Sequence, residues 1–323
     1  MSHHLQRLYK IFVCEASQDF SRIRRPQFDE RYHINIVIQM WSPPQSYQTR
    51  PIAVLACCWA AAGYNVNVRE PSLDQQIDAN HWIEANISTF TSSLNNILGE
   101  VSFYTELASA VNNAWIVFEA IPEVLELKIS TFAELEIQAP SDCILTSNSS
   151  SFKSSEMLSS LVDEDTKIRI CSVHYIMPPQ IKVVEIMTCG FTAPAILDFL
   201  VQKCKEANLQ PFVVQKESMG FIYNRLWAAI KRETLMILSE GVSDAGVVDE
   251  IFKSVLGTRY GPCFMMDHVG LDTVANIERH YVRERGLSDE HTVKFLEDNF
   301  IEQGKLGFKS GKGGLLSPVV VTE

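Results

Sequence analysis

The sequence predicts an α/β domain over about residues 40–217, followed by an all-helical domain over about 218–323. Two observations support this division. Between Arg50 and about Val214, short apolar runs of strand length alternate with amphipathic stretches, a pattern typical of β–α–β structure. After Gly220 the short runs end, and apolar residues recur at helical spacing. With 46% of its 323 residues hydrophobic, the chain can bury a core in each domain.

Seven apolar runs are the expected strands of the first domain. They are Pro51–Leu55, Val66–Val68, Trp115–Ala120, Cys143–Thr146, Ile168–Ser172, Lys182–Met187 and Phe212–Val214. Helices are expected between them where apolar residues share one helical face. These are a helix with Leu73, Ile77, Ile83 and Ile87 on one face, a short one around Leu107–Val111, and a longer one over Pro194–Leu209. In the second domain, Ile222, Leu226, Ile230 and Ile237 predict a helix that Gly241 ends.

The composition argues against a nucleic-acid-binding protein, a membrane protein and a disulfide-bonded protein. A formal charge of −11 argues against a general nucleic-acid binder, because such proteins carry a basic face. No apolar run approaches the roughly 18 residues that a membrane span needs, so no membrane partner is expected. The eight cysteines form no CxxC pair and no close framework, which favours reduced thiols in a cytoplasmic compartment.

The N-terminal residues 1–39 mix basic and acidic side chains and contain no long apolar run. Acids such as Glu15 and Asp19 argue against a mitochondrial transit peptide. We therefore expect residues 1–39 to be a poorly ordered extension, with Met40 as a plausible alternative start.

Three polar stretches contain residue types suited to oxidising an alcohol: 146–151, 174–185 and 220–226. This reaction needs a base for the hydroxyl proton, and a histidine such as His174 titrates near the working pH. Glu185, eleven positions later, can accept the second ring N–H and raise the basicity of the imidazole. Taken singly, a serine run, a histidine before two prolines and an asparagine at a helix start are more often structural.

Taken together and in this order, the stretches resemble the L-3-hydroxyacyl-CoA dehydrogenase family. The resemblance covers roughly residues 50–315. It implies a Rossmann-like domain that binds NAD, followed by an all-α domain that completes the substrate cleft and forms a homodimer. Further matching blocks are Glu119–Glu123 with Lys128, Tyr260–Pro262, Asp267–Asp272, Gly304–Gly307 and Ser310–Gly313.

The resemblance also implies roles for particular residues. His174 would be the catalytic base and Glu185 its partner, while Ser150 and Asn224 would hydrogen-bond the substrate oxygens. The interval from His174 to Glu185 is one residue shorter than in the family, and Met177 stands where the family has asparagine. For the cofactor, the resemblance points to Glu70, at the adenosine ribose, and to Glu123 and Lys128 in the strand-to-helix segment.

The glycine-rich fingerprint of dinucleotide-binding domains is absent after the first predicted strand. This strand, Pro51–Leu55, leads at once into Cys57–Tyr64, the end of the expected helix, and about nine residues with three glycines are lacking between them. We therefore expect the chain as written to bind NAD poorly. Either the sequence reflects an imperfect gene prediction or splice form, or this member has lost its redox chemistry.

The implied function is NAD-dependent interconversion of a 3-hydroxyacyl-CoA and a 3-oxoacyl-CoA, a reaction of fatty acid metabolism. Two alternatives remain open. One is a related dehydrogenase of a free hydroxy acid or sugar acid, and the other is a non-catalytic acyl-binding protein.

Overall fold

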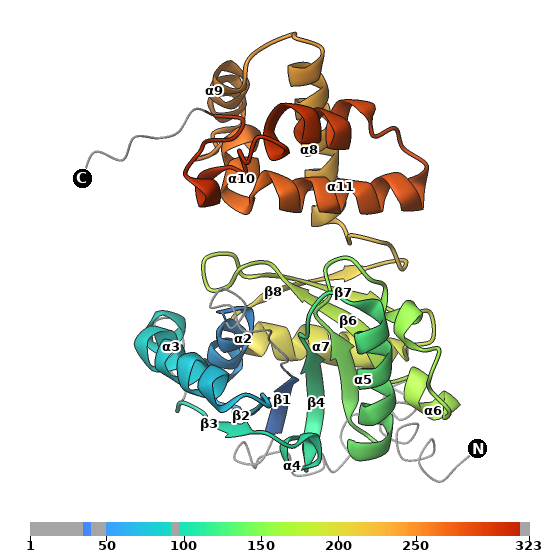
Figure 1. Cartoon of the computed structure of the whole chain (residues 1–323). Helices are drawn as coiled ribbons and strands as arrows, with labels where there is room; N and C mark the ends of the chain where they lie inside the picture. Colours follow the sequence, from blue (N-terminus) through green and yellow to red (C-terminus); the bar gives the residue numbers. More distant parts are fainter. Residues whose placement is uncertain (1–34, 40–49, 92–96, 317–323) are drawn as a thin grey trace, which may run out of the picture. The chain divides into compact units, whose positions relative to one another are not determined.

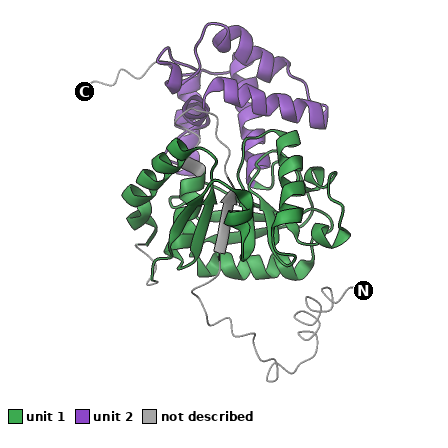
Figure 2. Cartoon of the chain, turned by 60° about the horizontal axis from the view of Figure 1, so that its bottom comes forward, with its two compact units in different colours: residues 1–222 green, residues 223–323 purple. Residues whose placement is uncertain are grey.

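A computed structural model of the chain describes residues 35–39, 50–91 and 97–316 (Figure 1). The chain divides into two compact units, residues 1–222 and residues 223–323 (Figure 2). The division lies four residues beyond the boundary expected near Ser218.

Unit 1 is built on an eight-stranded sheet with the order β3-β2-β1-β4-β5-β6-β7-β8. All described neighbours pair in parallel except β6 and β7, which are antiparallel. The order from β3 to β6 is the Rossmann arrangement, so the predicted Rossmann-like α/β class is confirmed. The strands are β1 Asn35–Gln39, β2 Asn65–Arg69, β3 Val101–Tyr104, β4 Ala114–Glu119, β5 Ile144–Ser147, β6 Ile170–Tyr175, β7 Val183–Thr188 and β8 Gln210–Val214.

Helices cover both faces of this sheet. Helices α2, α3 and α7 pack in one buried cluster with strand residues such as Phe118 and Val173. Helices α4 and α5 pack in a second cluster with Val117 and Leu145 on the opposite face. The helices are α2 Arg50–Ala61, α3 Leu73–Thr91, α4 Leu107–Val111, α5 Leu125–Gln138, α6 Glu164–Lys167 and α7 Pro194–Glu206, with a 3₁₀ turn at Ser154–Met157.

The prediction of a strand at Pro51–Leu55 is wrong, because these residues lie in helix α2. Proline is tolerated in the first turn of a helix, so Pro51 does not interrupt it. Nearly every side chain from Ile52 to Ala61 is buried, which leaves the helix apolar on all sides. A sequence without a polar face has no 3.6-residue period, and a short apolar run then reads equally well as a buried strand.

The first strand of the sheet is instead β1, Asn35–Gln39, which pairs with β2 and β4. These five residues are therefore not part of a poorly ordered extension; residues 1–34 lie outside the described part. The segment between β1 and α2 is 40–49, also outside the described residues, and it contains no glycine. The position directly after Leu55, where the sequence suggests a missing loop, lies inside α2.

The remaining strand predictions are confirmed to within three residues at either end, whereas β3 is not among the predicted strands. Helix α3 is confirmed, but its buried face is only partly the expected one. Ile83 is buried, whereas Leu73 and Ile77 are 65% and 53% exposed. Ala79 and Phe90 complete the buried side.

The regular elements of unit 2 in its described part are helices, as predicted, apart from one isolated antiparallel bridge between Gly307 and Gly313. Its core is formed by residues such as Leu235, Met266, Val274 and Leu296. No helix in the described ranges of the chain is both long and apolar enough to cross a membrane. The helices are α8 Tyr223–Ser239, α9 Ala245–Leu256, α10 Pro262–Val269 and α11 Leu271–Arg285, followed by π-helical segments at Glu290–Lys294 and Glu297–Ile301 and a 3₁₀ turn at Phe308–Ser310.

Candidate active site

His174 and Glu185 face each other across the antiparallel pair β6 and β7. They are direct register partners, and the His174 Nδ1 lies 3.6 Å from the Glu185 Oε2. His174 is 8% exposed and Glu185 is 2% exposed. At 3.6 Å the two atoms are too far apart for a good hydrogen bond but close enough for an ion pair when the imidazole is protonated. The fold thus brings together two residues that the sequence singled out.

The segment that ends unit 1 holds both members of this pair. The backbone N–H of Ile222 donates to the Glu185 Oε1 at 2.8 Å. The ring of Phe221 stacks on the His174 imidazole, with centroids 4.8 Å apart and planes inclined by 19°. Neither contact is expected from the sequence, although both residues belong to the 220–226 stretch.

The loop after β5 presents Ser150, whose side chain is exposed. Its two neighbours are fixed by Glu123. The Ser149 hydroxyl donates to the Glu123 Oε1 at 2.6 Å, and the Ser151 N–H donates to the same oxygen at 3.0 Å. Glu123 therefore supports the serine loop.

Asn148 ties the same loop to the strand of His174. Its Oδ1 accepts a hydrogen bond from the backbone N–H of Tyr175 at 3.1 Å. Because β5 and β6 are parallel neighbours, both end at the carboxyl edge of the sheet. Ser150 and His174 therefore project from the edge where open α/β sheets bind ligands.

Lys128 is a buried supporting residue in this structure. Its side chain is 1% exposed, and its Nζ lies 2.7 Å from the Glu119 Oε1, 3.2 Å from the Glu123 Oε2 and 3.2 Å from the Ile121 carbonyl oxygen. A lysine has three donors, and all three are occupied. The geometry favours a role in fixing Glu119 and Glu123 over direct cofactor contact.

Glu123 is held as a carboxylate by this arrangement. Burial alone would raise the pKa of the Glu123 carboxyl, but Lys128 and the hydrogen bonds from Ser149 and Ser151 outweigh it and lower the pKa. The Glu119 Oε2 in turn accepts a hydrogen bond of 2.6 Å from the Ser147 hydroxyl. The strand-to-helix segment and the serine loop therefore form one hydrogen-bonded unit.

Glu70 follows the last residue of β2 and is 1% exposed. Its Oε1 accepts from the Ser72 N–H at 2.8 Å, while its Oε2 is buried and has no hydrogen-bond partner among the described residues. Burial raises the pKa of the Glu70 carboxyl, against the opposing effects of Ser72 and Arg69.

Asn224 is the second residue of α8 and is partly buried. It belongs to unit 2, whereas His174 belongs to unit 1, so its place beside His174 stays a prediction. Met177, which replaces the asparagine that the resemblance leads us to expect, is 69% exposed and has a positive φ of 49°.

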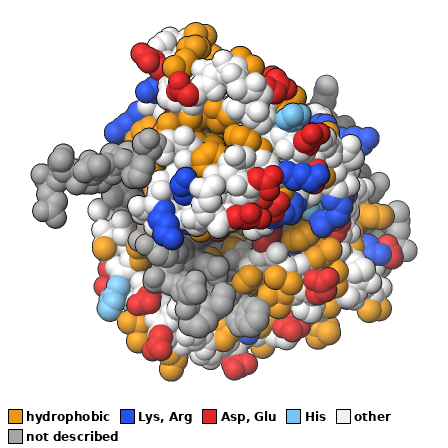
Figure 3. Space-filling view, turned by 45° about the horizontal axis from the view of Figure 1, so that its top comes forward, with side chains coloured by type: hydrophobic (Ala, Val, Ile, Leu, Met, Phe, Trp, Pro, Cys, Tyr) orange, Lys and Arg blue, Asp and Glu red, His pale blue; other side chains and the backbone are white. Residues whose placement is uncertain are grey.

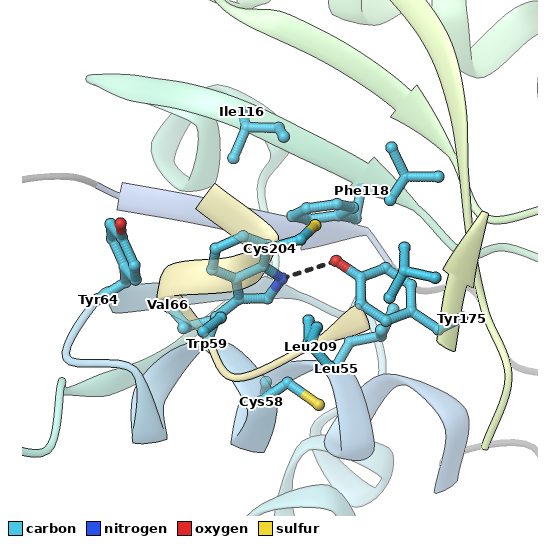
Figure 4. Packing of buried hydrophobic residues seen from close by; sticks show 14 of the residues in the cluster. Leu55, Cys58, Trp59, Tyr64, Val66, Ile116, Phe118, Tyr175, Cys204 and Leu209 are labelled. Carbon is cyan, nitrogen blue, oxygen red and sulfur yellow. Dashed lines mark hydrogen bonds between the residues drawn. The ribbon is translucent and has the colours of Figure 1, made fainter. Parts of the chain in front are cut away.

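Behind the site, Tyr175 anchors β6 to helix α2. The Trp59 Nε1–H donates to the Tyr175 hydroxyl at 3.0 Å within the core of unit 1 (Figure 4). Trp59 also stacks on Phe118, with ring centroids 5.5 Å apart. Tyr175, the residue directly after His174, is thus held in the core by the hydrogen bond from Trp59 of α2.

In the view of Figure 3, acidic and basic side chains are interspersed among hydrophobic ones. The seven cysteines in the described ranges are all buried free thiols. Burial raises the pKa of Cys57 and Cys204 to about 12, so neither is a nucleophile at neutral pH.

Comparison with known families agrees with this geometry. Residues 53–218 match the 3-hydroxyacyl-CoA dehydrogenase NAD binding domain, and residues 220–316 match the C-terminal domain of the same family. The chain belongs to the 3-hydroxyacyl-CoA dehydrogenase family. The domains meet between residues 218 and 220, close to the division between the two units.

The similar proteins include hydroxyacyl-CoA dehydrogenases and one dehydrogenase named for a pyridine carboxylate. A 3-hydroxyacyl-CoA dehydrogenase-like protein LAM1 of Cochliobolus heterostrophus is 52% identical over 155 residues, which are 47% of this chain and 32% of that protein. The mitochondrial hydroxyacyl-coenzyme A dehydrogenase of Rattus norvegicus is 30% identical over 217 residues, 67% of this chain and 68% of the rat protein. A 5-formyl-3-hydroxy-2-methylpyridine 4-carboxylate 5-dehydrogenase of Mesorhizobium japonicum is 26% identical over 220 residues, 67% of this chain and 70% of that protein.

Among solved structures, 3-hydroxybutyryl-CoA dehydrogenase from Escherichia coli superposes with a TM-score of 0.77 at 22% identity. The match covers 90% of this chain and 61% of that chain. At this identity the likeness establishes the fold.

The first domain of the family binds NAD. The surroundings of Glu70 show whether the described residues of this chain suit that cofactor. A buried carboxylate oxygen with no described partner, at the carboxyl end of β2, suits the hydroxyls of an adenosine ribose, which would donate to it. The residues described on the ribose side therefore fit the cofactor. The sequence has no glycine before Gly63, so it lacks the glycine-rich fingerprint that dinucleotide-binding domains use for the pyrophosphate.

Proposed function

We propose that this chain oxidises a 3-hydroxyacyl-CoA to the 3-oxoacyl-CoA with NAD, using His174 as the general base. The observation that carries the proposal is the buried His174–Glu185 pair at the carboxyl edge of the sheet, with Nδ1 and Oε2 3.6 Å apart. Family membership supports the reaction class, while the substrate and the base are our proposal.

Each residue has a defined task in this reaction. Because the His174 Nδ1 faces Glu185, the Nε2 is the nitrogen available to accept the hydroxyl proton of the substrate. Glu185 then stabilises the imidazolium that forms. The exposed hydroxyl of Ser150 and the amide of Asn224 would hydrogen-bond the substrate oxygens.

NAD, when bound, accepts the hydride that leaves the alcohol carbon. In this chain Glu70 would hold its adenosine ribose, and Glu123, positioned by Lys128, would lie on the cofactor side of the serine loop. Hydrogen bonds to charged groups contribute about 1.5–3 kcal/mol each, so the absence of the glycine-rich fingerprint from the sequence should weaken pyrophosphate binding. We therefore expect weaker NAD affinity than in family members with the glycine loop.

The test is NADH oxidation by the full chain with acetoacetyl-CoA, compared with free acetoacetate. We expect turnover of the CoA ester. In His174→Gln, kcat should fall by about 10²–10⁴-fold with little change in NADH affinity measured by titration calorimetry. The reason is that the variant lacks the group that gives a proton to the substrate oxygen in this direction and removes it in the oxidation. Activity of the variant within threefold of the parent would remove His174 from the mechanism.

One relative acts on a pyridine carboxylate by its name, which supports a free carboxylic acid as the alternative substrate. Turnover of free hydroxy acids without turnover of the CoA ester would establish that alternative. Acyl-CoA binding without NADH binding would instead favour a non-catalytic role. Homodimerisation, a cytoplasmic location and a place in fatty acid metabolism are further parts of the proposal, and sedimentation velocity tests the first of them.

A further inference from the structure

Residues 220–222 form an irregular link at the end of unit 1. Gly220 and Phe221 both have a positive φ, 77° and 55°. Glycine adopts this conformation at little cost, whereas a bulky residue such as phenylalanine does so only when its surroundings compensate. The surroundings of Phe221 therefore need an explanation.

Phe221 is 1% exposed and lies between two groups. It packs in a small cluster with Met187 of β7 and Val214 of β8. Its ring also lies nearly parallel to the His174 imidazole, with centroids 4.8 Å apart and planes inclined by 19°. Burial of a large aromatic ring offsets the cost of the positive φ, and it leaves the ring in contact with the proposed base.

The next residue holds the other half of the pair. The Ile222 N–H donates to the Glu185 Oε1, so the oxygen that faces His174 is the remaining Oε2. Two consecutive residues of the link thus fix the plane of the imidazole and the rotation of the carboxylate.

We propose that Phe221 is a positioning residue for His174, and that with the Ile222 N–H it forms a clamp on the His174–Glu185 pair. This inference rests on the proposed function. When His174 takes the substrate proton it becomes an imidazolium, and an aromatic face attracts a cation more strongly than a neutral ring. The contact therefore favours the transition state over the ground state, so it should act on kcat more than on KM.

The experiment compares Phe221→Leu with Phe221→Tyr and with Phe132→Leu in the full chain. Leucine keeps apolar volume but loses the aromatic face, while tyrosine keeps the face. Phe132 is a fully buried residue of α5 in a separate core cluster of unit 1, so it controls for the general effect of replacing a buried phenylalanine. L-3-Hydroxybutyryl-CoA and NAD are the probes, so that His174 takes up the proton in the direction measured. The melting temperature is measured for each variant.

We expect Phe221→Leu to lower kcat by about 3- to 10-fold with KM within twofold, the range that loss of one aromatic contact gives. Phe221→Tyr should retain most of kcat, and Phe132→Leu should lower the melting temperature without lowering kcat of the folded enzyme. If Phe221→Leu and Phe132→Leu behave alike, with full kcat and a lower melting temperature, Phe221 is only a core residue.

A second readout does not depend on turnover. In NMR spectra of the full chain, with the His174 signals assigned by His174→Gln, the Phe221 ring should shift the imidazole protons upfield, and the ring nitrogens should report one tautomer. In Phe221→Leu the upfield shift should vanish and the tautomers should mix. Unchanged His174 signals would overturn the clamp. If the parent chain turns over no substrate, the proposed function fails, while these spectra still decide whether Phe221 holds the ring.

Discussion

The pKa values of two buried carboxyl groups in unit 1, Glu123 and Glu70, are shifted in opposite directions. Glu123 has a lysine and two hydrogen bonds to one oxygen, so its charged form is favoured and its pKa falls. Glu70 has one hydrogen bond from Ser72 and a second oxygen without a described partner, so burial dominates and its pKa rises. The difference lies in the number of donors that each carboxylate receives.

Glu70→Gln should therefore stabilise the free protein while weakening cofactor binding. Since the folded-state pKa of Glu70 is raised, its unfavourable contribution appears as the pH rises through that pKa and is absent in acid. We expect the variant to melt at a higher temperature than the parent at about pH 8, with the difference shrinking toward about pH 4. Scanning calorimetry across this range provides the measurement.

The same variant should bind NAD about 5- to 10-fold more weakly, because a ribose hydroxyl donates more strongly to a carboxylate than to an amide oxygen. Unchanged NAD affinity would exclude Glu70 from the ribose site. A variant less stable than the parent at about pH 8 would contradict the argument from burial.

Among the elements, the loops after β4 and β5 behave as one structure because they share Lys128, Glu119 and Glu123. The ammonium of Lys128 is nine positions from Glu119 in sequence and spans from α5 back to the strand end. Its removal would leave Glu119, which is fully buried, without a cation.

Lys128→Met should therefore destabilise unit 1 by about 3–5 kcal/mol, the usual result of removing one partner from a buried ion pair. Lys167→Met is a matched control, because Lys167 pairs with Glu164 at the surface and such pairs contribute about 0–1 kcal/mol. Denaturant unfolding measures both. Equal losses for the two variants would show that the buried network contributes no more than a surface pair.

The elements also show where sequence reasoning succeeds. Strands β2 and β4 to β8 are predictable because polar residues delimit short apolar runs. Helix α2 is mistaken for a strand because its sequence is apolar on every side. That error moves the first strand downstream and hides β1, although Asn35–Gln39 contains three consecutive β-branched residues. Strand β3 has only four residues, all partly exposed, and gives little signal.

Only part of the candidate site is predictable from the sequence. His174 and Glu185 are recognisable together, and the antiparallel register places them opposite each other. The Phe221 and Ile222 contacts cannot be foreseen, because one depends on a positive φ and the other on a backbone N–H. Neither has a distinctive side-chain pattern.

For the molecule as a whole, β1 is an interior strand, with β2 on one side and β4 on the other. A chain translated from Met40 would lack it. We expect that shortened chain to be insoluble or largely unfolded, because removal of an interior strand leaves two unpaired edges and separates β3 and β2 from the rest of the sheet. A chain that begins at Arg31 retains β1 and is the control.

Circular dichroism and the melting transition of the two purified chains measure this expectation. A Met40 chain that melts cooperatively within a few degrees of the control would mean that β1 contributes little to the sheet.

The link 220–222 has a practical consequence for separating the two units. The change from short apolar runs to helical spacing of apolar residues suggests a domain boundary near Ser218. A fragment that ends at Ser218 would contain His174 but lack Phe221 and Ile222. Cutting after Ile222 keeps both contacts, and the helix α8 then begins the second fragment at Tyr223. Two fragments that differ by four residues would therefore carry the same sheet but differently ordered imidazoles.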